Sequence, residues 1–173
     1  VNSIKKRIII PYDNIPEFPK STISGHAGEW VFGYINEKPI ICASGRFHYY
    51  EGLTMEEITL PVSVIHSLGC ELLIITNASG CLKKGWNIGS FMLITSTLDF
   101  TFQGNVQDPS PIYIRSNEFD ELVRKAHTTA EQIGMSLNEG CYTWTSGPSY
   151  ETHAEVKKII ELNGNAVGMS SVP

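Results

Sequence analysis

Two periods of apolar residues alternate along the chain and predict an α/β fold. Short apolar runs typical of buried strands lie at residues 6–10, 30–35, 38–43, 70–80, 89–96, 140–147 and 165–171. Apolar residues at helical spacing mark residues 54–68, 118–133 and 149–164. Strands that alternate with helices usually build a sheet covered by helices. We therefore expect one α/β domain over residues 1–173, with a largely parallel sheet.

Local signals support several of these boundaries. Asn36-Glu37 separates two of the predicted strands and is a plausible hairpin turn. Thr54 and Glu57 have the spacing of a capping box, which predicts that a helix begins there. Pro61 lies inside that helix and should kink or delimit it, because proline cannot donate a backbone hydrogen bond.

Composition and charge narrow the class of protein. Apolar residues make up 42% and charged residues 18%, which fits a compact globule rather than a disordered chain. The net charge is −5, and the densest basic cluster, Lys5 to Arg7, is too short to bind nucleic acid. No apolar run reaches membrane-spanning length, and the polar N-terminus lacks a secretory segment. We expect neither a nucleic-acid nor a membrane partner.

The cysteines indicate a reduced, cytoplasmic protein without a structural metal. The chain has four cysteines, none forms a CxxC pair, and no histidine lies at zinc-finger spacing from them. The histidines likewise lack a second ligand at metal-binding spacing. Metal catalysis is therefore not expected.

Small and polar residues end several predicted strands, as in "TNASG", "TSGPSYE" and "GMSS". In open α/β sheets, ligands bind beyond the carboxyl ends of the strands. The sequence "SGRFHYYEG" adds Arg46 and His48, two positions apart after a predicted strand, a pair suited to a phosphate or carboxylate. The alternative is an Arg46–Glu51 ion pair with His48 bound to a backbone carbonyl.

Four further positions have a functional and an ordinary interpretation. Asn77 to Gly80 could approach an anion with backbone N–H groups, or could be a plain strand exit. Glu151 could bind a ligand, or could stabilise the first turn of a helix. Met169 with Ser170 could form a site floor beside a donor, or Met169 could be a core residue. His26 lies in a glycine-framed loop that could cover a site or form a surface turn.

Five motifs together resemble the trimeric purine nucleoside phosphorylases over nearly the whole chain. They are "STISGHAGEWVFG", "GRFHYYEG", "TNASG", "SGPSYET" and "VGMSSVP", in this order. The resemblance implies a single α/β domain with a mixed, mostly parallel central sheet flanked by helices. It also implies reversible phosphorolysis of purine (deoxy)ribonucleosides, a pentosyl transfer of purine salvage. Free base and (deoxy)ribose 1-phosphate are the products, and inosine and guanosine are the expected substrates. Orthophosphate is a co-substrate, no cofactor is needed, and the expected assembly is a cytoplasmic homotrimer.

The resemblance also implies roles for individual residues. The implied phosphate-binding residues are Arg46, His48, Ala78 and Ser170. The implied sugar- and base-binding residues are Tyr50, Tyr150, Glu151, Met169, His26 and, from the neighbouring subunit, Phe102. Glu151 and His48 are the implied catalytic residues, and Tyr150 stands where the family usually has phenylalanine.

The chain departs from the family in three places. It is expected to lack the Gly-Ser-Gly loop that precedes Val1 in the family and the segment that follows Pro173, and the region after Phe102 is shorter and different. Two alternatives to a purine nucleoside phosphorylase stay open. The first is a methylthioadenosine phosphorylase, against which "GRFHYYEG" and "GPSYE" argue. The second is a degenerate, non-catalytic subunit that binds nucleoside or phosphate.

Overall fold

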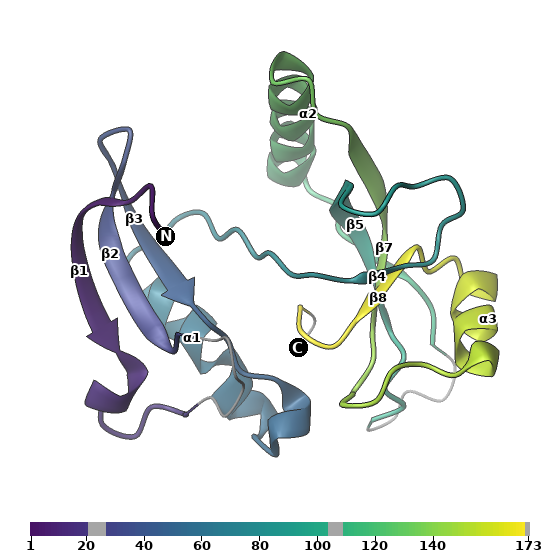
Figure 1. Cartoon of the computed structure of the whole chain (residues 1–173), viewed down its shortest axis with the longest axis horizontal. Helices are drawn as coiled ribbons and strands as arrows, with labels where there is room; N and C mark the ends of the chain where they lie inside the picture. Colours follow the sequence, from purple (N-terminus) through teal and green to yellow (C-terminus); the bar gives the residue numbers. More distant parts are fainter. Residues whose placement is uncertain (21–26, 104–108, 172–173) are drawn as a thin grey trace. The chain divides into compact units, whose positions relative to one another are not determined.

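The computed structural model describes residues 1–20, 27–103 and 109–171. The chain separates into two compact units (Figure 1). Unit 1 comprises Val1–Ile75, and unit 2 begins at Thr76. Each unit has its own sheet and its own buried apolar cluster. The expectation of one domain over residues 1–173 stays a prediction.

Unit 1 contains an antiparallel sheet of three strands in the order β1-β2-β3. The strands are β1 (Lys5–Pro11), β2 (Glu29–Ile35) and β3 (Lys38–Ser44). The predicted hairpin between the second and third strands is confirmed. Asn36 and Glu37 have φ angles of 47° and 64°, the left-handed conformation that a tight two-residue hairpin requires.

Helix α1 (Met55–Ser67) begins where the capping box predicts. The Thr54 Oγ1 atom accepts a bond from the Glu57 amide at 3.2 Å, and the Glu57 carboxylate accepts one from the Thr54 amide at 2.7 Å. The helix continues through Pro61 rather than stopping there. The described residues of the unit also include two short 3-10 turns, η1 (Tyr12–Asn14) and η2 (Tyr49–Glu51).

The core of unit 1 is an aromatic cluster between the sheet and α1. Its buried members are Tyr12, Phe18, Trp30, Phe47 and Ile58. Ring centroids in this cluster lie 5.0 to 6.2 Å apart, most of them at tilted or edge-on angles that aromatic pairs favour. Burial of four large rings provides much of the stability of this small unit.

Unit 2 contains a mixed sheet of five strands in the order β4-β8-β7-β5-β6. The strands are β4 (Gly80–Cys81), β5 (Phe91–Asp99), β6 (Ile112–Tyr113), β7 (Leu137–Trp144) and β8 (Ala166–Gly168). The pairs β5–β7 and β7–β8 are parallel, and the two outer pairs are antiparallel. The predicted α/β class with a mixed sheet and flanking helices is confirmed.

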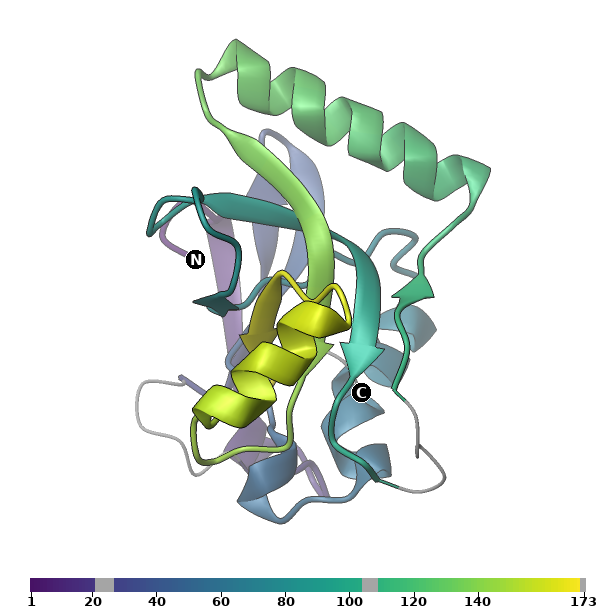
Figure 2. The same cartoon turned by 90° about the vertical axis from the view of Figure 1, so that its right-hand side faces the viewer.

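Two helices accompany this sheet. Helix α3 (His153–Glu161) lies alongside β7 and β8 in both views (Figures 1 and 2). Its Ile159 is fully buried and packs with Phe100 and Val167. Helix α2 (Asn117–Gln132) precedes β7, and the side chains of His127 and Glu139 join the helix to that strand at 2.6 Å.

The expectation of a strand over residues 70–80 is wrong for residues 70–79, which form neither helix nor strand. Four apolar side chains of this segment are exposed, namely Leu72, Leu73, Ile74 and Ile75. The segment contains the boundary between the two units. An apolar run becomes a strand only where another strand pairs with it, and hydrophobicity alone does not supply that partner.

Tyr12 should make unfolding sensitive to alkaline pH. Its hydroxyl donates to the Gly45 carbonyl at 3.3 Å, and burial, followed by the charges of Cys42 and Glu29, raises its pKa to about 12. The folded-state pKa lies above the ordinary value of about 10. The contribution of Tyr12 to stability is therefore complete below pH 10 and lost as the pH rises towards 12.

We expect Tyr12→Phe to flatten the fall in unfolding free energy between pH 10 and pH 12, measured by urea denaturation at each pH. The control is Tyr113→Phe, because the Tyr113 side chain is exposed. An equally steep fall of the unfolding free energy in wild type and Tyr12→Phe would show that the Tyr12 hydroxyl is not the titrating group.

Candidate active site

The predicted site residues fall into two groups, one in each unit. Unit 1 carries Arg46, His48 and Tyr50. Unit 2 carries Ala78, Phe102, Tyr150, Glu151, Met169 and Ser170. His26, the remaining predicted residue, lies outside the described residues.

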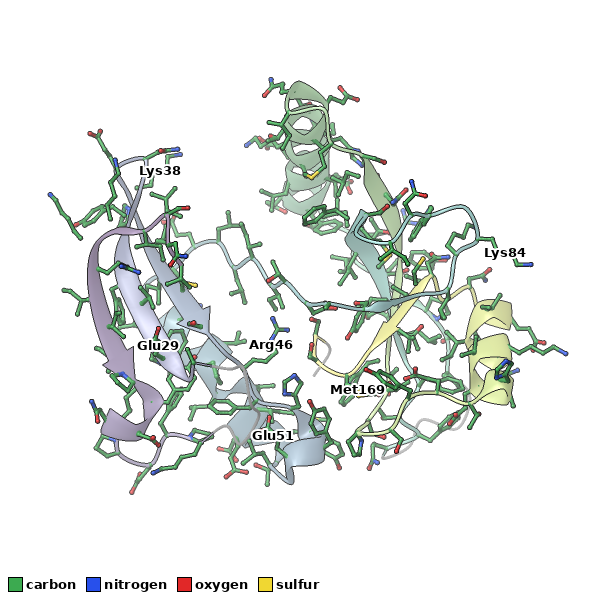
Figure 3. The ribbon with its side chains drawn as sticks, in the orientation of Figure 1. Glu29, Lys38, Arg46, Glu51, Lys84 and Met169 are labelled. Carbon is green, nitrogen blue, oxygen red and sulfur yellow. The ribbon has the colours of Figure 1, made fainter. Side chains whose placement is uncertain are left out.

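The unit 1 group follows the end of β3 directly. Phe47 is buried in the aromatic cluster, and this anchors the chain between Arg46 and His48. The backbone before it is also held, since the Gly28 amide donates to the Ser44 carbonyl at 2.9 Å. Arg46 is half-buried and extends from this segment (Figure 3). A fixed backbone of this kind presents a guanidinium without a long flexible loop.

His48 is held by Glu51, a partner that sequence reasoning did not assign to it. The Glu51 Oε1 atom lies 3.0 Å from His48 Nδ1 and also accepts a bond from the His48 backbone amide at 2.8 Å. Both side chains are almost fully buried, at 9% and 2% exposure. A carboxylate on Nδ1 favours a proton there and so fixes the ring, which leaves Nε2 as the second polar atom.

Tyr50 extends the same arrangement. Its ring stacks on the His48 ring with centroids 4.9 Å apart and planes inclined by 16°. Burial, and then the charge of Glu51, raises the pKa of the Tyr50 hydroxyl. Within unit 1, a cation, a fixed imidazole and a neutral phenol therefore lie within five consecutive positions.

The unit 2 group gathers at one edge of the five-stranded sheet. Because β5, β7 and β8 are parallel, their carboxyl ends meet at the same edge. Phe102 follows β5, Glu151 follows β7, and Met169 with Ser170 follows β8. The strand ends are joined there, since the Phe100 amide donates to the Trp144 carbonyl at 2.9 Å.

Glu151 is oriented by a hydroxyl rather than used as a helix stabiliser. The Thr145 Oγ1 atom donates to Glu151 Oε1 at 2.7 Å. Helix α3 begins at His153, with Thr152 as its N-cap and Glu155 as its first-turn carboxylate. Glu151 thus precedes the cap, and the interpretation of it as a first-turn residue does not hold. Glu151 as a whole is half-buried.

The segment around Ala78 lies beside the segment around Ser170. Strand β4 pairs antiparallel with β8, so the residues before Gly80 run beside those after Val167. The Asn77 side-chain amide then donates to Ser171 Oγ at 2.7 Å. Ser79 in turn donates to the Asn77 carbonyl oxygen. Sequence reasoning missed the role of Asn77, although it stands inside the quoted "TNASG" motif.

Tyr142 supports Ser170 from within the sheet. It is fully buried on β7, and its hydroxyl accepts a bond from the Ser170 backbone amide at 3.2 Å. Gly168 provides the space, because a Cβ atom at that position would lie 2.6 Å from the Tyr142 hydroxyl oxygen. The turn that carries Met169 and Ser170 is therefore positioned by a core tyrosine.

The remaining predicted residues present apolar surface. Met169 is half-buried (Figure 3). The Tyr150 side chain is 91% exposed. Phe102 is 54% exposed, has a φ angle of 54° and packs edge-on against Phe100 at 4.8 Å.

Within residues 1–20, 27–103 and 109–171, no group of three or more His, Cys, Asp or Glu side chains could hold a metal ion. In the same part of the chain, every helix is too short or too polar to cross a membrane.

Comparisons with known proteins agree on one family. The family model of the phosphorylase superfamily matches residues 1–173. Purine nucleoside phosphorylase 1 of Geobacillus stearothermophilus is 39% identical over 180 residues, covering 99% of this chain and 65% of that protein. Purine nucleoside phosphorylase of Mus musculus is 39% identical over 182 residues, covering 98% of this chain and 63% of that protein.

Solved structures of purine nucleoside phosphorylases are similar in fold at lower sequence identity. Schistosoma mansoni purine nucleoside phosphorylase in complex with inosine has a TM-score of 0.85 at 31% identity, covering 99% of this chain and 65% of that one. A purine nucleoside phosphorylase in complex with ribose-1-phosphate has a TM-score of 0.85 at 32% identity, covering 99% of this chain and 68% of that one. The chain thus spans slightly less than two thirds of the two sequence relatives.

The buried carboxylate of Glu51 should be important for stability. We expect Glu51→Ala to lower the free energy of unfolding by about 2 kcal/mol, because it leaves the amide and ring nitrogen of His48 without their acceptor. Urea denaturation of the variant provides the measurement. The control is Glu71→Ala, which removes an exposed carboxylate from the segment without regular structure. Similar small losses in both variants would argue against the role given to Glu51.

Proposed function

Because the chain belongs to the phosphorylase superfamily, we propose that it catalyses reversible phosphorolysis of purine (deoxy)ribonucleosides. In this reaction a phosphate oxygen bonds to the anomeric carbon and the glycosidic C–N bond breaks. The electron pair leaves with the purine, and the products are free base and (deoxy)ribose 1-phosphate. Inosine and guanosine are the proposed substrates, orthophosphate is the co-substrate, and no cofactor is required.

One observation carries the proposal. At the carboxyl ends of β7 and β8, an oriented carboxylate and the serine-bearing segment that we assign to phosphate share one sheet edge. Glu151 is held there by Thr145, whose own amide donates to the Gly168 carbonyl at 3.0 Å. Gly168 in turn leads directly into Met169 and Ser170. A base acceptor and phosphate donors at one edge are what nucleoside phosphorolysis needs.

The chemistry of the side chains supports assigned roles. We assign Arg46, His48, the Ala78 amide and Ser170 to phosphate, because charge-assisted bonds from preorganised donors favour a dianion. We assign Glu151 to an N–H group of the purine ring, and Tyr50, Tyr150 and Met169 to the sugar and base. His26 is assigned to the sugar by resemblance alone. His48 and Glu151 are the proposed catalytic residues.

The named relatives support the same ligands. Solved neighbours have been crystallised with inosine, with hypoxanthine and with ribose-1-phosphate, which are a substrate and the two products of inosine phosphorolysis. We further propose a cytoplasmic homotrimer in which Phe102 contacts the sugar site of a neighbouring subunit. The exposed ring of Phe102 supports that assignment, because such a ring is usually covered by another surface.

Arg46 tests the phosphate assignment and the reaction together. We expect phosphate-dependent release of hypoxanthine from inosine, and little release of adenine from methylthioadenosine. Arg46→Ala should raise the KM for phosphate about tenfold or more, because it removes a charge-assisted bond, while hypoxanthine affinity stays unchanged.

The control for that variant is Arg115→Ala, because Arg115 lies on the exposed Tyr113 ring in unit 2. Equal losses for phosphate and hypoxanthine in Arg46→Ala would contradict the phosphate role. Binding of hypoxanthine and phosphate without any turnover would favour the non-catalytic alternative. Faster cleavage of methylthioadenosine than of inosine would favour a methylthioadenosine phosphorylase.

Glu151 should set the preference between purines. A carboxylate can only accept, so it favours a ring N–H, whereas glutamine can offer either a donor or an acceptor. We expect Glu151→Gln to shrink the ratio of kcat/KM for inosine over adenosine about tenfold or more. The control is Glu161→Gln, which changes an exposed carboxylate at the end of α3. An unchanged ratio in Glu151→Gln would refute the role.

A further inference from the structure

We propose that Thr145 is a positioning residue that fixes the Glu151 carboxylate and thereby strengthens selection of purines that carry a ring N–H, the 6-oxopurines. The inference rests on the proposed function, because it assumes that Glu151 receives the base. Thr145 is not among the residues that the family resemblance assigns.

Thr145 is itself rigidly placed. It is the first residue after β7 and is 9% exposed. Its backbone amide donates to the Gly168 carbonyl at 3.0 Å, which ties it to the end of β8. The backbone of Thr145 is therefore fixed at the sheet edge. Because the side chain is also buried, the direction of its hydroxyl group is restricted.

The single hydroxyl proton of Thr145 points to Glu151. The Thr145 Oγ1 atom lies 2.7 Å from Glu151 Oε1 and 3.5 Å from the Gly168 carbonyl oxygen. A hydroxyl has one proton to donate, and a bond to a carboxylate at the shorter distance is the stronger of the two. We therefore assign the proton to the bond with Glu151.

This bond limits the freedom of a mobile side chain. Glu151 is half-buried and precedes the N-cap of α3, so the helix ladder does not fix its side chain. A free glutamate loses rotamer entropy when it binds a ligand, and a glutamate that is already held loses less. With Oε1 bound to Thr145, the carboxylate keeps one orientation and offers its remaining acceptor positions to the purine.

Thr143, two positions earlier and still within β7, shows that burial alone does not require such a bond. Thr143 is fully buried on β7, yet none of the described residues gives its hydroxyl a hydrogen-bonding partner. The position of Thr143 therefore depends on packing. Thr145 differs because its hydroxyl reaches a carboxylate that we assign to the substrate.

The test compares three variants of the full-length chain with wild type. Thr145→Val removes the hydroxyl and keeps the shape, Thr145→Ser keeps the hydroxyl, and Thr143→Val is the matched control two positions earlier, within β7. We expect Thr145→Val to raise the KM for inosine about tenfold and to lower the inosine-over-adenosine ratio of kcat/KM about tenfold, with the KM for phosphate unchanged. Thr145→Ser and Thr143→Val should resemble wild type in all three readouts.

Each outcome decides the inference. Active wild type with an unchanged ratio in Thr145→Val would overturn the role of Thr145 and leave the proposed function standing. Lost selectivity in Thr145→Ser would also overturn it, because the methyl group rather than the hydroxyl would then matter. If valine prevents folding, Thr145→Ala provides the same readout. A wild-type protein that neither binds hypoxanthine nor cleaves inosine would overturn the proposed function, and this inference with it.

Discussion

Parallel pairing of β7 with β5 on one side and β8 on the other is the constraint on which unit 2 depends. It places the carboxyl ends of β5, β7 and β8 at one edge of the sheet. The segments that follow these three strands therefore begin side by side. The contacts of Glu151, Ser170 and Asn77 all lie at that edge. Residues far apart in the chain become neighbours because three strands run in the same direction.

In unit 1 the polar site residues are positioned by a buried aromatic residue instead of a sheet edge. Phe47 is buried among other aromatic rings, and the polar residues on either side of it take their positions from that burial. The buried Glu51 then fixes the His48 ring from the next turn. Burial of the His48 ring and the Glu51 carboxylate would cost free energy without the two contacts between these residues. The contacts that fix the imidazole therefore also offset the cost of burying it.

The predictable parts of the molecule are those encoded by short sequence distances. The capping box at Thr54 and the hairpin at Asn36-Glu37 depend on residues a few positions apart, and both are confirmed. The strand expected over residues 70–79 failed because pairing needs a partner that hydrophobicity does not specify. The largely parallel part of the sheet followed from the alternation of strands and helices, whereas the short antiparallel strands β4 and β6 left too little pattern to find. Among the site contacts, Thr145 with Glu151 requires a turn of unforeseeable shape, and Asn77 with Ser171 joins residues 94 positions apart. Motif resemblance could indicate the residues expected to touch substrate, but not those that hold them.

Tyr142 and Gly168 restrict how this chain can change over evolutionary time. A side chain larger than hydrogen at position 168 would collide with the Tyr142 hydroxyl, unless residue 142 also became smaller. A smaller residue at 142 would remove the acceptor for the Ser170 amide and leave a space in the core. Neither position can vary alone without loss, so the two should be inherited as a pair. Substitutions in the interior of β7 and at the start of the turn after β8 are therefore coupled, even though only the turn is expected to contact a ligand.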